Sequence, residues 1–205
     1  MLNRLLALSA LVCLMITGVA YAATINGTRS EDTIFGTTRG DRIDAKAGED
    51  IVFGLSGNDV LEGGPGGDTI HGDAQCPAGS RDPNACRQTR GFGNDTIQGN
   101  AGDDVIAGGN GADKISCGTG EDNIQGGNGS DTINGGLSSD ALYGQAGSDR
   151  RTPGSGRDTV VAGDGNDTGL ARDRSRDRID CGAGRDTAHV DSADTTRNCE
   201  RVVRR

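Results

Sequence analysis

Aspartate recurs at every ninth position along most of this chain. The series runs from Asp32 to Asp68, from Asp95 to Asp167 and, after a slip of one residue, from Asp177 to Asp186. Two residues after 13 of these 16 aspartates stands Ile, Leu or Val. Carboxylates kept in step with aliphatic residues predict one short structural unit copied many times. The chemistry of one unit is therefore most of the chemistry of the protein, and that chemistry is cation binding by carboxylates.

Calcium is the cation that these residue types favour. It accepts about six to eight oxygen ligands in flexible geometry, and the glycine-rich residues before each aspartate offer backbone carbonyls beside the carboxylate. Magnesium demands a stricter octahedron, and softer metals prefer His or Cys ligands, which most of the repeats lack. Closely stacked carboxylates without a cation would repel one another and oppose folding. The pattern thus predicts several bound Ca²⁺ ions.

The elements that position the aspartates are a turn and a very short strand. Typical units are GGNGSDTIN from Gly126 and GLSGNDVLE from Gly54. The first six residues of each unit must turn, because glycine tolerates positive φ angles, and the last three can extend with the central aliphatic residue on one face. A strand of three residues is unstable alone, so successive strands must stack and bury a continuous aliphatic row.

Two nonapeptides in each coil would place the turns on opposite edges of the stack. We therefore predict an all-β fold, a parallel β-roll that forms a right-handed β-solenoid. Each turn would lie above the turn 18 residues earlier, at a strand spacing of roughly 4.8 Å. This arrangement places Asp50 over Asp68, and it pairs Asp104 with Asp122 and Asp113 with Asp131.

The units resemble the GGxGxDxUx nonapeptide of the repeats-in-toxin, or haemolysin-type, calcium-binding proteins. The resemblance covers about Gly27 to Asp167 and implies a β-roll in which each calcium ion lies between two turns. Asp32 and Asp41 depart from the pattern, since the fourth residue of their units is Ser or Arg. The metal ligands that the resemblance implies are the sixth-position aspartates Asp50, Asp59, Asp68, Asp95, Asp104, Asp113, Asp122, Asp131, Asp140, Asp149 and Asp158.

The composition excludes an ordinary hydrophobic core. Glycine supplies 36 of the 205 residues, aromatic residues make up 2%, and Trp is absent. The formal net charge is −9, and the repeats carry the acidic excess, so nucleic acid is excluded as a partner. Such a chain buries too little apolar surface to offset its ordering entropy. We therefore expect the repeats to fold only when calcium binds.

The first 22 residues have the pattern of a secretory signal peptide. Arg4 precedes an apolar run from Leu5 to Val19, and Ala20-Tyr21-Ala22 forms an A-x-A cleavage site. The apolar run is shorter than the roughly 20 residues needed to cross a bilayer. We expect a secreted, extracellular protein that does not span a membrane when mature.

The mature chain divides into a repeat array and a degenerate end. The array is expected over residues 23–171, with an 18-residue loop insertion at 72–89, and an Arg-rich cap or tail over 172–205. The inward positions near this end become Arg151, Gly169 and Ala188. The five mature cysteines of an exported protein predict two disulfides, Cys76–Cys86 and Cys181–Cys199, and leave Cys117 unpaired.

The leading hypothesis is a secreted calcium-binding repeat protein. The alternative is a calcium-rigidified adhesion or cell-surface structural protein, with possible cell-surface or polysaccharide contact. An enzyme is not expected, because the repeats leave no room for a catalytic domain. His71 and His189 are the only histidines, so an H-E-x-x-H zinc motif is also excluded.

Overall fold

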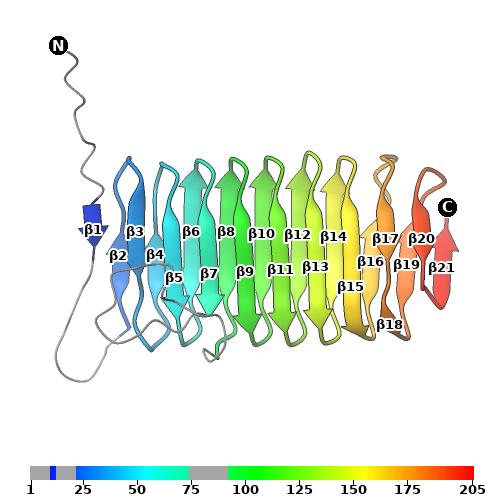
Figure 1. Cartoon of the computed structure of the whole chain (residues 1–205), viewed down its shortest axis with the longest axis horizontal. Helices are drawn as coiled ribbons and strands as arrows, with labels where there is room; N and C mark the ends of the chain where they lie inside the picture. The colour runs from blue at the N-terminus through cyan, green and yellow to red at the C-terminus, as the bar shows by residue number, and fades with distance from the viewer. Residues whose placement is uncertain (1–9, 13–21, 74–91) are drawn as a thin grey trace, which may run out of the picture.

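The computed structural model describes residues 10–12, 22–73 and 92–205, and it shows a parallel β-solenoid (Figure 1). The chain alternates between two sheets that run along the whole solenoid, so that strands two apart in sequence pair with each other. The predicted all-β parallel β-roll is confirmed. Over the described ranges, no helix is long and apolar enough to cross a membrane.

The two sheets divide the strands between them. The first sheet contains β1 (Ala10–Val12), β3 (Asp32–Phe35), β5 (Ile51–Leu55), β7 (Thr69–Asp73), β9 (Val105–Asn110), β11 (Asn123–Asn128), β13 (Ala141–Ala146), β15 (Thr159–Gly165), β17 (Arg178–Asp180), β20 (Thr195–Arg197) and β18 (Ala183–Gly184), which pairs with β15. The second contains β2 (Thr24–Asn26), β4 (Arg42–Asp44), β6 (Val60–Pro65), β8 (Thr96–Ala101), β10 (Lys114–Thr119), β12 (Thr132–Leu137), β14 (Arg150–Ser155), β16 (Thr168–Ala171), β19 (Thr187–Val190) and β21 (Arg201–Arg204).

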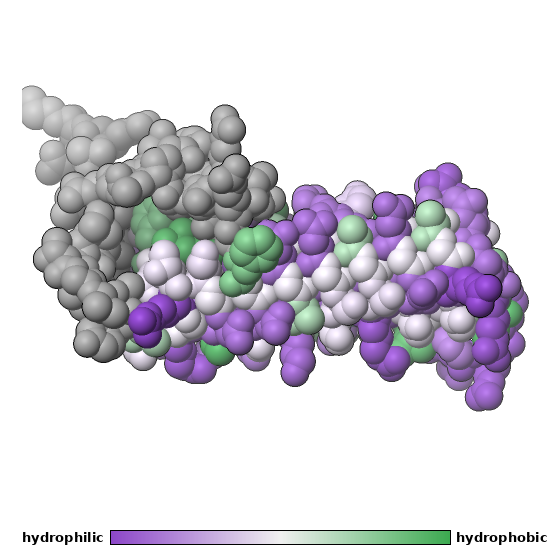
Figure 2. Space-filling model, turned by 90° about the horizontal axis from the view of Figure 1, so that it is seen from below, coloured by the Kyte–Doolittle hydropathy of each residue, from purple (hydrophilic) through white to green (hydrophobic). Residues whose placement is uncertain are grey.

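The core is one aliphatic row from each sheet. Ile115 pairs with Ile133 in the second sheet, and Ile124 pairs with Leu142 in the first, each with an offset of 18 residues. Side chains alternate across a strand, so alternate residues point inward, and the aliphatic residue is the first of these in strands such as β10. These inward residues are almost fully buried, as the sequence pattern predicts. Figure 2 shows that hydrophilic and neutral residues predominate on one outer face.

The sheets continue without a break across residues 74–91. Strand β6 pairs directly with β8, and β7 pairs directly with β9. Leu61 therefore lies beside Ile97 in the aliphatic row, although they are 36 residues apart. The insertion predicted from residue 72 begins inside β7, whose last residue is Asp73. The predicted Cys76–Cys86 disulfide lies outside the described residues.

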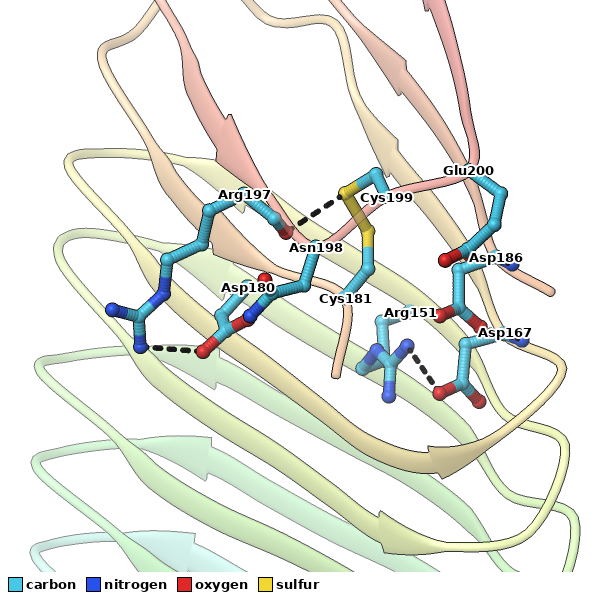
Figure 3. The surroundings of a disulfide bond; sticks show 9 residues. All are labelled: Arg151, Asp167, Asp180, Cys181, Asp186, Arg197, Asn198, Cys199 and Glu200. Atoms are coloured by element: carbon cyan, nitrogen blue, oxygen red, sulfur yellow. Dashed lines mark hydrogen bonds and ion pairs between the residues drawn. A yellow bond between two sulfur atoms is a disulfide. The ribbon is translucent and has the colours of Figure 1, made fainter. Parts of the chain in front are cut away.

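The C-terminal residues continue both sheets to the end of the chain. Strands β17 and β20 extend the first sheet, and β19 and β21 extend the second. The predicted disulfide between Cys181 and Cys199 is present, and it joins residues that flank two successive turns (Figure 3). Cys117 is unpaired, as predicted, and it is buried. Burial raises the pKa of the Cys117 thiol and so disfavours the reactive thiolate.

The turns depend on glycine where the backbone enters the left-handed region. Gly129 has φ of 131°, and an added Cβ there would collide with the carbonyl oxygen of Gly111 on the neighbouring coil. Only glycine adopts this conformation readily, and only glycine allows the two backbones to approach so closely. Gly169 differs, since an added Cβ there meets no atom within 4 Å.

This contrast gives a matched pair of glycine substitutions. We expect Gly129→Ala to lower the free energy of unfolding by about 1–3 kcal/mol or more, through backbone strain and the collision with Gly111. We expect Gly169→Ala to leave it unchanged or to raise it by up to about 1 kcal/mol, because alanine restricts the unfolded chain. Urea unfolding followed by circular dichroism measures both. Equal losses in the two variants would contradict this explanation.

Candidate metal centre

The aspartates form two continuous ladders on opposite edges of the solenoid. Each aspartate lies at the start of a strand and is buried. The first ladder consists of Asp32, Asp50, Asp68, Asp104, Asp122, Asp140, Asp158, Asp177 and Asp194. The second consists of Asp41, Asp59, Asp95, Asp113, Asp131, Asp149, Asp167, Asp186 and Glu200.

One oxygen of each ladder carboxylate after Asp32 is held by the backbone of the neighbouring coil. The N–H of Asp113 donates to Oδ1 of Asp131 at 2.9 Å, and the N–H of Asp104 donates to Oδ1 of Asp122 at the same distance. This bond repeats along both ladders and fixes the orientation of the carboxylates that accept it. The three stackings predicted from the sequence, Asp50 on Asp68 among them, are confirmed.

The other oxygen, Oδ2, is buried without a hydrogen-bond partner in the described part of the chain. This holds for every aspartate that the sequence predicts as a metal ligand, from Asp50 to Asp158, and also for Asp167, Asp177 and Asp186. Buried polar atoms are nearly always paired, so a repeated row of unpaired oxygens requires an explanation. A cation bound between the turns is the explanation that fits carboxylate chemistry.

Glycines make the space beside these oxygens. An added Cβ at Gly135 would lie 2.7 Å from Oδ2 of Asp140, and one at Gly126 would lie 2.5 Å from Oδ2 of Asp131. The same relation, glycine five residues before aspartate, recurs along the array. Because these glycines have no side chain, the backbone of the turn can lie close to Oδ2 of each aspartate.

Burial raises the pKa values of the ladder carboxyls. The pKa of Asp95 rises to about 8, that of Asp104 to about 7 and that of Asp68 to about 6, mainly because burial removes water from the charged form. The backbone N–H bonds oppose this rise, and repulsion from neighbouring carboxylates adds to it. Without a cation these groups would retain part of their protons near neutral pH, so a bound cation would replace protons.

Asp32 and Asp41 differ from the other aspartates. Thr28 donates through its backbone N–H and its hydroxyl to Oδ2 of Asp32, the latter at 2.9 Å. Thr37 donates through its backbone N–H to Oδ2 of Asp41 and through its hydroxyl to Oδ1 at 3.0 Å. These two carboxylates find partners inside their own turns, which agrees with the departure of their units from the nonapeptide pattern.

The sequence reading missed the last member of each ladder. Asp194 accepts from the N–H of Asp177 at 3.1 Å, and Glu200 accepts from the N–H of Asp186 at 2.8 Å. The spacing shortens to 17 residues in the first case and 14 in the second, so the nine-residue period no longer points to them. The signal that remained was an acidic residue just before each of the last two strands.

The ladders alone do not complete a metal site. In residues 22–73 and 92–205, no point gathers three or more His, Cys, Asp or Glu side chains. A cation between successive aspartates must therefore take its remaining ligands from other groups. The backbone carbonyls of the glycine-rich turns are the nearest oxygen ligands. A ligand set of two carboxylates and several carbonyls suits calcium better than it suits zinc or copper.

A protein-family model supports the same interpretation. The model, described as the RTX calcium-binding nonapeptide repeat, matches residues 26–61, 35–70, 90–116, 117–150 and 153–168. These segments cover more than half of the chain. The chain belongs to this family. All eleven aspartates predicted as metal ligands lie inside the RTX segments, whereas Asp177 and Asp186 lie beyond them. A search of curated proteins found no match.

Proposed function

We propose that this RTX-repeat protein is a secreted protein that binds several Ca²⁺ ions and folds when they bind. The observation that carries the proposal is the row of buried Oδ2 atoms without partners along both ladders. Membership of a calcium-binding repeat family supports the identity of the cation. Membership of this family also supports a binding role rather than a catalytic one.

The proposed ligands fall into two rows, one for each edge. Calcium, when bound, neutralises the carboxylates and cross-links successive turns. The backbone N–H of each aspartate holds the next carboxylate in place, and the glycine before it leaves room for the cation. The residues that we propose as ligands are Asp50, Asp59, Asp68, Asp95, Asp104, Asp113, Asp122, Asp131, Asp140, Asp149 and Asp158.

Coupled folding follows from the weakness of the core. Most strands bury only one large aliphatic side chain, which contributes about 1.5–3 kcal/mol. Ordering the backbone costs roughly 1–2 kcal/mol per residue, and the buried carboxylates add to this cost. A cation that binds the folded state alone shifts the balance toward folding. Calcium binding would therefore determine the stability of the whole array.

Secretion is supported by the leader-like residues 1–22 and by the disulfide. A disulfide such as Cys181–Cys199 forms and persists in an oxidising compartment. The thiol of Cys117 is compatible with that setting, because it is buried in the core and shielded from exchange. We propose that the leader is removed and that the mature repeats fold outside the cytoplasm.

A calcium titration of the full chain tests the proposal. Circular dichroism is expected to change from coil to β signal when CaCl₂ is added to metal-free protein at neutral pH, and equilibrium dialysis is expected to show several ions bound per chain. The same concentration of MgCl₂ is the control, and it should produce little change because magnesium requires stricter geometry. A metal-free chain that is already folded and indifferent to calcium would disprove the proposal.

A further inference from the structure

One inward position of the second sheet carries a charged residue. Arg151, in β14, pairs with Ile133 on one side and with Gly169 on the other, so it occupies a place in the aliphatic row. Its side chain is only 2% exposed. A buried arginine keeps its charge and is tolerated only where anions and hydrogen-bond acceptors surround it.

The guanidinium of Arg151 spans one step of the second ladder. Its Nη1 lies 3.6 Å from Oδ2 of Asp149. Its Nη2 lies 3.6 Å from Oδ2 of Asp167, and Figure 3 shows this second contact. Nη1 also donates to the backbone carbonyl of Ala162 at 2.9 Å. Elsewhere in the described ladders, from Asp50 to Asp186, the equivalent Oδ2 atoms have no hydrogen-bond partner. Between Asp149 and Asp167 the positively charged guanidinium of Arg151 lies beside both Oδ2 atoms.

A glycine in the preceding strand leaves space for this side chain. An added Cβ at Gly144, in β13, would collide with Nη1 of Arg151. Gly169 faces Arg151 in the strand register, but an added Cβ there would meet no atom within 4 Å, so the guanidinium does not fill the position of the missing side chain. The guanidinium also opposes the rise that burial causes in the pKa of Asp149.

We propose that Arg151 is a resident counter-ion that takes the place of a calcium ion between Asp149 and Asp167. This inference rests on the proposed function, since it assumes that the other steps of the ladder bind calcium. It also means that Asp149 would bind calcium only on the side that faces Asp131. The coil that contains Arg151 would hold together without metal at this edge.

Two variants of the full chain test the proposal. Arg151→Leu restores the aliphatic residue of the repeat and removes the cation, whereas Arg151→Lys keeps a positive charge. In equilibrium dialysis we expect the leucine variant to bind one more calcium ion per chain than the wild type, and the lysine variant to bind the same number. In a calcium titration followed by circular dichroism we expect the leucine variant to need more calcium than the wild type to fold, because Asp149 and Asp167 lose their counter-ion.

The outcomes separate this inference from the proposed function. A wild-type chain that binds calcium, together with a leucine variant of unchanged stoichiometry, overturns the role of Arg151. A wild-type chain that binds no calcium overturns the proposed function instead, and the folded fractions of the two chains by circular dichroism then decide whether Arg151 neutralises the carboxylates. If the leucine variant does not fold in metal-free buffer, its calcium-loaded form still gives the stoichiometry.

Discussion

The metal-free array is expected to lose stability as the pH rises from about 4 to about 8. The folded-state pKa values of Asp68, Asp104 and Asp95 are raised to about 6, 7 and 8, above the ordinary value of 3.8. Below about pH 4 both the folded and the unfolded chain carry these protons, and the stabilisation is fully present. As the pH rises, the unfolded chain releases its protons first and becomes favoured.

Calcium is expected to reverse this dependence. The carboxylates must lose their protons to bind the metal, so the calcium-loaded array gains stability toward neutral pH and loses it as the pH falls. Asp180 has the opposite effect on stability, because Arg197 lowers its pKa. The stability that Asp180 contributes is lost only at pH values below the ordinary pKa of a carboxyl group. It therefore does not change the sign between pH 4 and 8.

Circular dichroism at several pH values between 4 and 8 gives the folded fraction of the metal-free chain, and urea midpoints give the stability of the calcium-loaded chain. The metal-free series requires protein stripped of metal and buffers passed over a chelating resin, because soluble chelators weaken in acid. The calcium series uses the same buffers with CaCl₂ added, and the two series should agree most closely at acidic pH and separate toward neutral pH. A metal-free folded fraction that rises toward pH 8 would contradict the view that buried, unpaired carboxylates oppose folding.

The period of the sequence predicts most of the fold because each unit has one structural solution. Glycine-rich residues must turn, a three-residue strand can bury only its central side chain, and stacking is the only way to make that burial continuous. The offset of 18 residues between Ile115 and Ile133 follows directly. The same offset would have predicted the stack of Phe35 on Phe53, whose rings lie 5.1 Å apart on the outer face.

The hydrogen bonding of the carboxylates was harder to predict. Spacing alone presents stacked aspartates as repelling charges, whereas each Oδ1 accepts a backbone N–H from the adjacent coil. Arg151 interrupts the aliphatic pattern and suggests a weakening end, but it is buried and lies beside two carboxylates. Both features depend on contacts between coils, which a period within the chain does not specify.

Asp104, near the middle of the first ladder, is expected to be essential for the calcium-loaded state. Asp104→Ala removes a proposed ligand and leaves the N–H of Asp68 buried without its acceptor, 2.7 Å away in the wild type. The unpaired N–H alone costs about 1–3 kcal/mol, and the lost site adds to it. Asp103→Ala is the matched control, because it removes the same charge from an exposed neighbour in the same turn.

Asp104→Asn separates the metal from the hydrogen bond. The amide oxygen can still accept from the N–H of Asp68, but the side chain carries no charge. At pH 8 the metal-free array should therefore become more stable than the wild type, since it no longer buries the Asp104 carboxylate, whose pKa is about 7. With calcium it should become less stable, since asparagine is the poorer ligand. The folded fraction by circular dichroism in metal-free buffer and the urea midpoint in calcium measure this reversal, and a loss in both would show that Asp104 acts through packing rather than through the metal.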